Sequence, residues 1–217
     1  KQQMYFMPMG IFAKVMHEAD NIYGMKFHTI GRGEPLLNQN LPAFVEYVKC
    51  KGMIDVRLNT NGLLLDFDMM VALLNAKLDM IIFSVDGSTK EEYNKSRPTA
   101  DFEKLVDIIR MFTAIRNVGK FNTLIRVQTI RLPHINLESF VDFWRTRADE
   151  VTVVDYKDMG ERVYNLSSGW ICPQPWQRMS VLYNGNVLPC NHDDRCYKVL
   201  GNIENHTLND LWNSISM

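Results

Sequence analysis

The sequence predicts an α/β fold with a parallel sheet and outer helices. An apolar strand, a turn of Gly, Asn or Asp and an amphipathic helix follow one another repeatedly, and polar residues gather where the strands end. Strands that alternate with helices of about 10 to 15 residues are typical of right-handed βαβ units. The loops after such strands open on one face, where ligands bind. We therefore expect Glu34, Asn61, Ser84 and Asp86 to converge on one site, although they are far apart in the sequence.

Length and composition limit the possible classes. With 217 residues, of which 46% are hydrophobic and 23% charged, the chain can form one globular domain with a small appendage. A formal net charge of -1 predicts no nucleic-acid partner and no anionic membrane surface. No apolar run reaches the roughly 18 residues of a membrane-spanning helix, and the start of the chain lacks the pattern of a signal peptide. A cytoplasmic location is therefore expected.

The elements of the α/β region are expected in a fixed order. Apolar residues at helical spacing, with Pro8 near the start, predict a first helix over 8–23, and MKFHTI after Gly24 is a strand. The later elements are a helix over 41–51 ended by Gly52, a strand over 54–59, a helix over 66–76, a strand over 79–84, a short helix in TKEEYNKSR, a helix from Asp101, whose side chain caps it, through Ile115, a strand over 122–131, a helix over 137–147 and a strand over 150–156.

The pattern changes at Lys157. Residues 157–169 are polar and without periodicity, which is typical of a linker. Two short strand-like runs, RMSVLY and NVLPC, then lie on either side of Asn184-Gly185, a strong signal for a β-hairpin. HTLNDLWNS predicts a last amphipathic helix with Leu208, Leu211 and Trp212 packed inward.

Three turns carry the candidate binding residues. In GRGEP (31–35), Gly31 and Gly33 let the backbone approach a ligand, Pro35 fixes the turn, and Glu34 offers a carboxylate for an ammonium group. The alternative is a tight turn with a solvated Glu. TNG and SVDG, taken alone, are ordinary turn sequences. Their equivalent positions on successive βα units favour the functional interpretation.

Two arginines and a glutamine extend this set. Arg97 follows the short helix and could form a bidentate pair with a carboxylate, or it could be a solvated or Asp-paired surface residue. Arg126 and Gln128 share a face of the next strand because they are two residues apart. For Arg126 the alternative is a salt bridge at the rim of the sheet.

The four cysteines are too few for a disulfide scaffold, and three of them cluster near the end of the chain. Cys50 has no second ligand nearby, so a packed or half-exposed thiol is expected. Cys172 and Cys190 flank the hairpin, and Cys196 follows five residues after Cys190. Thiolates gathered in this way favour zinc or an iron–sulfur cluster, and the alternative is unligated thiols on a small module. His192 could ligate zinc, and the alternative is a solvent-facing histidine.

Together these residues resemble a known family. GRGEPLL after a strand, then TNG, then SVDG with a downstream Arg, and finally CPQPW with NGNVLPC and LGNIENHTLNDLWNS, are similar to radical S-adenosylmethionine (SAM) enzymes that carry a SPASM or twitch auxiliary-cluster domain. The resemblance implies a partial (β/α)6 barrel over 1–156, a linker over 157–169 and a small hairpin-and-helix module over 170–217. It covers nearly the whole chain.

The resemblance also implies an activity and its cofactors. In that family a 4Fe-4S cluster binds SAM and, when reduced, yields a 5'-deoxyadenosyl radical that takes a hydrogen atom from the substrate. The implied substrate is a peptide side chain or a small polar metabolite, and the implied electron donor is a flavodoxin or ferredoxin. An auxiliary iron–sulfur cluster is expected in the tail, with Cys172 and Cys190 as ligands and Cys196 as a third candidate.

Roles for the binding residues follow from the resemblance. The backbone of Gly31 to Gly33 and the carboxylate of Glu34 would hold the methionine ammonium of SAM, and Ser84 and Arg97 its carboxylate. The other implied positions are Asn61 and Asp86 near the ribose or substrate, and Gln128 with strand 153–156 on the adenine side.

One family feature is absent from this sequence. The C-x3-C-x2-C loop that holds the catalytic cluster, and the barrel strand before it, do not occur in the printed residues. The chain is then expected to be a fragment, the ordered part of a longer protein, or a truncated form. A degenerate homologue that has lost the chemistry and binds a ligand in the same barrel is an alternative. A zinc-stabilised structural module around Cys172, Cys190 and His192 is another.

Overall fold

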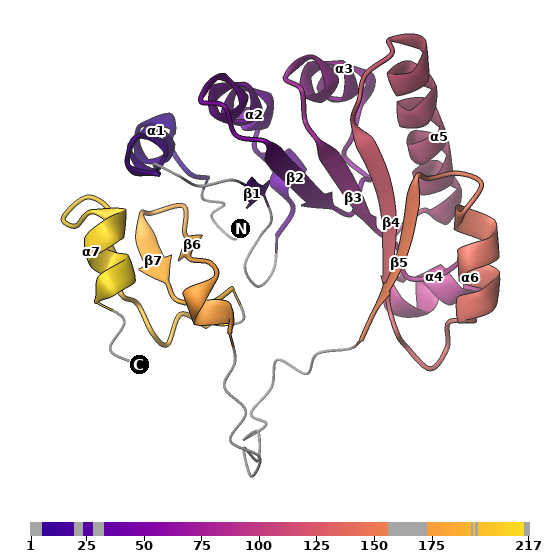
Figure 1. Cartoon of the computed structure of the whole chain (residues 1–217). Helices are drawn as coiled ribbons and strands as arrows, with labels where there is room; N and C mark the ends of the chain where they lie inside the picture. The colour runs from indigo at the N-terminus through magenta and orange to yellow at the C-terminus, as the bar shows by residue number, and fades with distance from the viewer. Residues whose placement is uncertain are drawn as a thin grey trace. The chain divides into compact units, whose positions relative to one another are not determined.

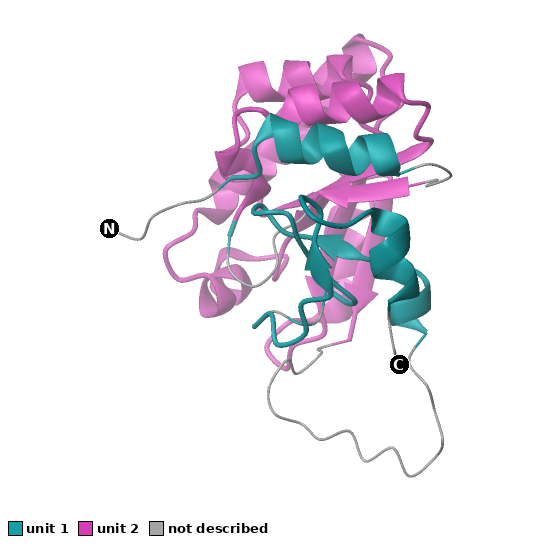
Figure 2. Ribbon diagram, turned by 90° about the vertical axis from the view of Figure 1, so that its left-hand side faces the viewer, with its two compact units in different colours: residues 1–22, 29–33, 157–217 teal, residues 23–28, 34–156 magenta. Residues whose placement is uncertain are grey.

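The structure, a computed structural model, describes residues 6–19, 24–27, 33–155, 173–191, 193 and 195–214. The chain divides into two compact units, which Figure 2 colours separately. One, here called the sheet unit, comprises residues 23–28 and 34–156, and the other, here called the tail unit, comprises residues 1–22, 29–33 and 157–217. Each is described by itself.

The sheet unit contains a five-stranded parallel sheet in the order β1-β2-β3-β4-β5, which confirms the predicted architecture. Figure 1 shows α2, α3, α5 and α6 on one face of this sheet. Its elements are β1 (Gly24–Phe27), η1 (Pro35–Leu37), α2 (Leu41–Cys50), β2 (Asp55–Thr60), α3 (Phe67–Asn75), β3 (Met80–Ser84), α4 (Lys90–Ser96), α5 (Phe102–Val118), β4 (Leu124–Ile130), α6 (Leu137–Trp144) and β5 (Glu150–Val154).

Short polar side chains start the helices of the sheet unit. Asp101 accepts a hydrogen bond from Lys104 N and caps α5, as predicted, and Asp66 accepts one from Met69 N at the start of α3. Thr89 and Asn136 cap α4 and α6 in the same way. Each cap satisfies one of the backbone N–H groups that a helix leaves without a partner in its first turn.

The two faces of the sheet differ in chemistry. The face toward the helices is apolar, with Leu58, Ile81, Phe83, Ile125 and Val127 fully buried. Phe83 packs edge-on against Phe112 of α5 with ring centroids 6.3 Å apart. This face forms the core of the unit, and burial of each such side chain contributes about 1.5–3 kcal/mol.

The opposite face carries polar side chains in two rows of the strand register. One row contains Asn59, Ile82, Arg126 and Glu150, and the next contains Ser84, Gln128 and Thr152. Parallel sheets usually bury both faces under helices and are then apolar on both. A half-buried polar face therefore indicates a surface that meets ligand or solvent.

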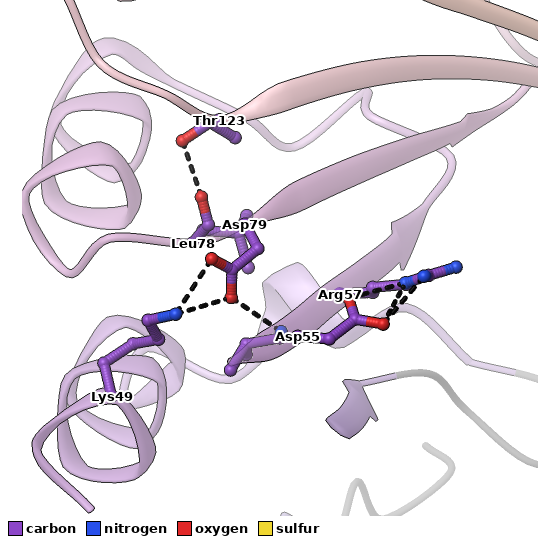
Figure 3. A network of polar contacts seen from close by, with 7 residues as sticks. Lys49, Asp55, Arg57, Leu78, Asp79 and Thr123 are labelled. Atoms are coloured by element: carbon purple, nitrogen blue, oxygen red, sulfur yellow. Dashed lines mark hydrogen bonds and ion pairs between the residues drawn. The ribbon is translucent and has the colours of Figure 1, made fainter. Parts of the chain in front are cut away.

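The same arrangement of an aspartate and a basic residue occurs twice at the amino-terminal edge of the sheet, and Figure 3 shows the one at Asp79. Asp79, just before β3, accepts hydrogen bonds from Val56 N at 2.7 Å and from Lys49 Nζ of α2. Asp149, just before β5, accepts one from Ile125 N at 2.7 Å and pairs with Arg116 of α5. In both places the aspartate accepts a hydrogen bond from a backbone N–H of the neighbouring strand. It also pairs with a basic side chain of the helix that precedes that strand in the chain.

The tail unit is built around a small antiparallel sheet in the order β6-β7-β8. Gly185, with φ +83°, occupies the turn of the predicted hairpin between β6 and β7, which is confirmed. The sequence did not predict β8. Leu208 and Leu211 are buried as expected, but the inward packing expected of Trp212 is wrong, because this residue is 36% exposed. The elements are α1 (Met9–Glu18), η2 (Gln174–Trp176), β6 (Ser180–Val181), β7 (Asn186–Leu188), β8 (Gly201–Asn202) and α7 (Leu208–Asn213).

Some predicted boundaries were wrong. The first helix ends at Glu18 and not at 23, because Ala19 has φ -81° and ψ 47°, outside the helical region. Helix α5 continues to Val118, beyond the expected end at Ile115, and stops at Gly119. Helix α6 ends at Trp144 rather than 147. Element ends are the least reliable part of any prediction from a hydrophobic pattern.

Candidate cofactor site at the carboxyl edge of the sheet

Glu34 lies at the centre of a hydrogen-bonded loop after β1. Its Oε1 accepts hydrogen bonds from Leu36 N and from the hydroxyl of Thr60, and its Oε2 accepts one from Asn61 N at 2.8 Å. The carboxylate thus joins the loop after β1 to the end of β2. Oε2 accepts a single hydrogen bond from the described residues, so it keeps capacity for another donor such as an ammonium group.

The turn after β2 places Asn61 beside this carboxylate. Gly62 N donates to Thr60 Oγ1 at 2.9 Å, and Leu63 N donates to Asn61 Oδ1 at 2.9 Å. Gly62 has φ +80°, and a Cβ there would lie 2.7 Å from the ring of Phe83, so only glycine fits. No partner of Asn61 Nδ2 occurs among the described residues, so this amide is available to a ligand.

Ser84 ends β3 next to a residue that the sequence analysis missed. Asn59 Nδ2 of β2 donates to Ser84 Oγ at 3.2 Å, while Asn59 Oδ1 is buried and has no hydrogen-bond partner among the residues that the structure describes. Gln128 is the register neighbour of Ser84 on β4. A buried acceptor without a donor is costly, so Asn59 Oδ1 requires a water or a ligand donor. The alternation of polar residues in DVRLNT was the signal for it.

Asp86 and Arg97 form an ion pair across the loop after β3. Arg97 Nε donates to Asp86 Oδ2 at 2.8 Å, and the Asp86 side chain is 11% exposed. The Arg97 guanidinium also lies 5.9 Å from the ring centroid of Tyr93. The Asp-paired alternative for Arg97 is therefore what the structure contains. Its two Nη groups have no partner within the described ranges, so the fork can still receive a carboxylate.

The SVDG turn is supported from behind. Gly87 has φ +153°, and a Cβ there would lie 2.7 Å from Cβ of Glu92. Its carbonyl accepts a hydrogen bond from buried Trp144 Nε1 at 3.1 Å. Burial alone would raise the pKa of Glu92, but hydrogen bonds donated by Asn136 N and Ser88 outweigh it, so the pKa is lowered. This carboxylate joins the loop after β3 to the start of α6.

Arg126 and a second arginine form ion pairs further down the polar face. Arg126 Nε donates to Glu150 Oε2 at 2.7 Å, which is the salt-bridge alternative considered for this residue. Arg57 pairs with Asp55, and the hydrogen bond that Arg57 donates to this carboxylate raises the pKa of Arg57. These four charged groups are balanced in sign. They make the amino-terminal half of this face strongly polar.

The donors and acceptors at the carboxyl edge match the chemistry of SAM. Its carboxylate would need hydroxyl and guanidinium donors, which Ser84 and Arg97 offer, and its ammonium would need the acceptor at Glu34. Gln128 brings an amide without a partner among the described residues, and the orphaned Asn59 Oδ1 accepts one more donor. Gly33, exposed, and Pro35, the first residue of η1, flank Glu34. Gly31 lies outside the described residues.

The tail carries two of the predicted metal ligands. Cys190 and Cys196 are half-buried thiols, joined by consecutive turns in which Asp193 N donates to Cys190 O and Cys196 N donates to Asp193 O. Asp193 also accepts hydrogen bonds from Tyr197 N and Lys198 N, both at 2.8 Å. Among the described residues no three possible ligands come together. Cys172 and His192 lie outside those residues, so the ligand set stays a prediction.

Comparison with known families decides the relationship. Residues 2–143 match the family model of the radical SAM superfamily, and residues 172–217 match that of the SPASM iron–sulfur cluster-binding domain. The chain belongs to the radical SAM superfamily. These two domain types imply SAM and iron–sulfur clusters as cofactors. No described helix of this radical SAM chain is long and apolar enough to cross a membrane.

Relatives in sequence agree with the assignment. The chain is 31% identical over 102 residues to a probable GTP 3',8-cyclase of Methanocaldococcus jannaschii, covering 47% of this chain and 33% of the relative. It is 30% identical over 136 residues to the GTP 3',8-cyclase of Hydrogenovibrio crunogenus, covering 62% and 40%. The chain thus spans less than half of either relative.

A solved structure shares the fold over almost the whole chain. The crystal structure of BtrN in complex with AdoMet and 2-DOIA superposes with a TM-score of 0.57, covering 98% of this chain and 72% of that one, at 18% identity. The likeness supports the α/β architecture with a small antiparallel sheet at the end. It carries no inference about substrate.

Proposed function

We propose that this chain is the core of a radical SAM enzyme that takes a hydrogen atom from a small polar metabolite or a peptide side chain. When bound, the reduced iron–sulfur cluster and SAM supply the 5'-deoxyadenosyl radical for that step. The chain's own residues bind and orient SAM and the substrate. Single-electron reduction requires a donor, for which a flavodoxin or ferredoxin is our proposal.

One observation carries the proposal. Polar groups with unused donors or acceptors end three adjacent strands, in the segments that the family match covers. Arg97 Nη, Ser84 Oγ and Glu34 Oε2 offer the two donors and the acceptor that an amino acid moiety needs. Asp86 holds Arg97 by its Nε, which orients the fork of the guanidinium.

The polar face of the sheet supports a polar substrate. Toward the amino-terminal edge, this face of the sheet carries Arg57, Arg126 and Glu150 in ion pairs. An apolar substrate there would remove water from these charged groups without replacing the hydrogen bonds that the water made. The matched relatives carry GTP, a small polar metabolite, in their names. This favours a metabolite over a peptide side chain.

The test is the affinity for SAM, measured by calorimetry on the anaerobically reconstituted protein expressed with its complete gene. Arg97→Gln removes a charged, forked donor, and we expect affinity to fall about 10- to 100-fold. Arg110→Gln, an exposed arginine paired only with Asp107 on α5, is the matched control and should bind like the wild type.

Cleavage decides between enzyme and binding protein. Reconstituted protein with reductant should convert SAM to methionine and 5'-deoxyadenosine. Binding of SAM without cleavage, with a full complement of iron, would select the catalytically inactive binding protein. Zinc without iron in the purified protein would select the structural module.

A further inference from the structure

Helix α1 contacts α7 at the end of the chain. Lys14 Nζ donates to the carbonyl of Glu204 at 3.1 Å, and Glu18 Oε2 accepts a hydrogen bond from Leu208 N at 2.7 Å. Lys14 and Glu18 are four residues apart on α1, hence on the same side of that helix. A cation and an anion on one helix face therefore hold the two ends of the short segment that leads into α7.

Helix α7 depends on such support. It has six residues, and helices this short are not stable alone in water. The Thr207 hydroxyl accepts a hydrogen bond from Asp210 N, the third helical position. The Asp210 carboxylate in turn accepts one from Thr207 N. The N–H of Leu208, the first helical position, has no partner in that capping box. Glu18 supplies the missing acceptor, with a negative charge favourable at a helix start.

This contact crosses the boundary between the two family domains. Helix α1 lies in residues 2–143, matched by the radical SAM family, and α7 lies in residues 172–217, matched by the SPASM domain. Contacts nevertheless group α1 with α7 in one compact unit, whereas the sheet that follows α1 in the chain belongs to the other unit. The first helix of one domain is therefore a structural part of the other.

We propose that Glu18 is a positioning residue that couples the tail to the first helix of the radical SAM domain. A change that loosens the start of α7 then also loosens α1. The inference deepens the proposed function. It rests on that function only for its effect on SAM, because α1 lies within the residues that the radical SAM family model matches.

The test changes α7 and observes α1. Leu208→Pro removes the N–H group that donates a hydrogen bond to Glu18. Proline is favoured at the first helical position, and Thr207, with φ -78° and ψ 156°, already has the extended backbone that a residue before proline requires. Leu208→Ala is the matched control, since it also loses the buried side chain but keeps the N–H. Hydrogen exchange of the complete, reconstituted protein is followed by mass spectrometry.

We expect Leu208→Pro to speed exchange in α1 about fivefold relative to Leu208→Ala, the factor that one capping hydrogen bond represents. In a Glu18→Ala background the two Leu208 variants should exchange alike in α1, because the acceptor is already gone. Glu18→Gln, which keeps a neutral acceptor, should restore part of the difference. Equal exchange in α1 for both Leu208 variants beside an intact Glu18 would overturn the coupling.

A second readout separates this inference from the proposed function. If the enzyme binds SAM as proposed, Leu208→Pro should weaken SAM binding relative to Leu208→Ala, with iron content unchanged. If the wild type fails to bind SAM, the proposed function fails while the exchange experiment still decides the coupling. If the wild type binds SAM but both Leu208 variants have the same affinity for it, the coupling between α7 and α1 does not affect the cofactor, and the predicted effect on SAM is wrong.

Discussion

Glu34 shows how one side chain can assemble a site from segments far apart in sequence. Its two oxygens accept hydrogen bonds from Leu36 N, the Thr60 hydroxyl and Asn61 N. A carboxylate is acceptor-only, so all three donors are satisfied at once. The ammonium-binding role predicted for Glu34 would use the acceptor capacity that remains at Oε2.

The first prediction concerns Glu34→Gln. The new amide would turn an NH2 group toward a donor, leaving at least one N–H or O–H unsatisfied. We expect the free energy of unfolding in urea to fall by about 1–3 kcal/mol and the affinity for SAM to fall with it. Glu46→Gln, on an exposed position of α2, is the control and should change neither. Unchanged stability in Glu34→Gln would mean that these hydrogen bonds do not form in solution.

At the residue scale, the sequence predicted positions better than partners. Asn61, Ser84 and Asp86 follow strands whose ends meet at one edge, so their placement follows from the βα pattern. Asn59 was missed because the alternation in DVRLNT indicates which face Asn59 shares with Asp55 and Arg57, but only the register of β2 with β3 places it beside Ser84. That Arg97 pairs with Asp86 depends on the path of the loop between them, which no periodicity describes.

At the scale of elements, the aspartates before β3 and β5 hold the amino-terminal edge of the sheet, and Figure 3 shows the contacts of the first, Asp79. Asp79→Ala leaves Val56 N without an acceptor and Lys49 without an ion pair whose side chains are only 18% and 33% exposed. We expect a loss of about 2 kcal/mol in the free energy of unfolding. Asp79→Asn keeps an oxygen for Val56 N and should lose about half of that.

The control for this prediction is an aspartate in an exposed ion pair. Asp107 pairs with Arg110 on the surface of α5, with side chains 61% and 79% exposed. Asp107→Ala should change stability by no more than about 0.5 kcal/mol. Equal effects of Asp79→Ala and Asp107→Ala would show that the edge network does not contribute.

Glu92 gives a prediction for pH. Its pKa is lowered below the ordinary value of 4.5, since the hydrogen bonds from Asn136 N and Ser88 outweigh the effect of burial. A lowered pKa in the folded state contributes stability above the ordinary pKa, and that stability is lost as the pH falls through the folded value. The stability difference between wild type and Glu92→Gln should therefore be largest near neutral pH and shrink below about pH 4.5. A difference that stays constant from pH 7 to 3 would contradict it, and Glu91→Gln, exposed on α4, should show no such dependence.

The order and type of elements were predictable because each has a clear period or turn signal, as at Asn184-Gly185. Their ends were not, as Ala19 shows: alanine is a good helix former, yet α1 ends before it. Strand β8 was missed since two residues, Gly201 and Asn202, carry no pattern, and only pairing with β7 makes them a strand.

At the scale of the whole molecule, two compact units do not coincide with the domains expected from the sequence. The predicted division at 157–169 follows a change in composition, whereas the contacts assign α1 to the tail unit. Composition is local, while the grouping of α1 with α7 depends on Lys14 and Glu18 meeting a segment about 190 residues away. The division into a SAM-binding part over 1–156 and an auxiliary-cluster part over 170–217 stays a prediction.

The last prediction concerns the metal of the tail unit. A thiolate ligand binds iron far better than a hydroxyl, so Cys190→Ser should lower the iron and sulfide content per chain after anaerobic reconstitution. Cys50→Ser, at an exposed thiol on α2, should leave both unchanged. Asp193→Ala keeps every thiol but removes the acceptors for Tyr197 N and Lys198 N, and with them the shape of the loop that carries Cys196. If Cys196 is a ligand, Asp193→Ala and Cys196→Ser should both lose iron, and the alanine variant less of it. Full iron in Cys196→Ser with loss in Cys190→Ser would restrict the site to Cys190 and ligands outside the described residues.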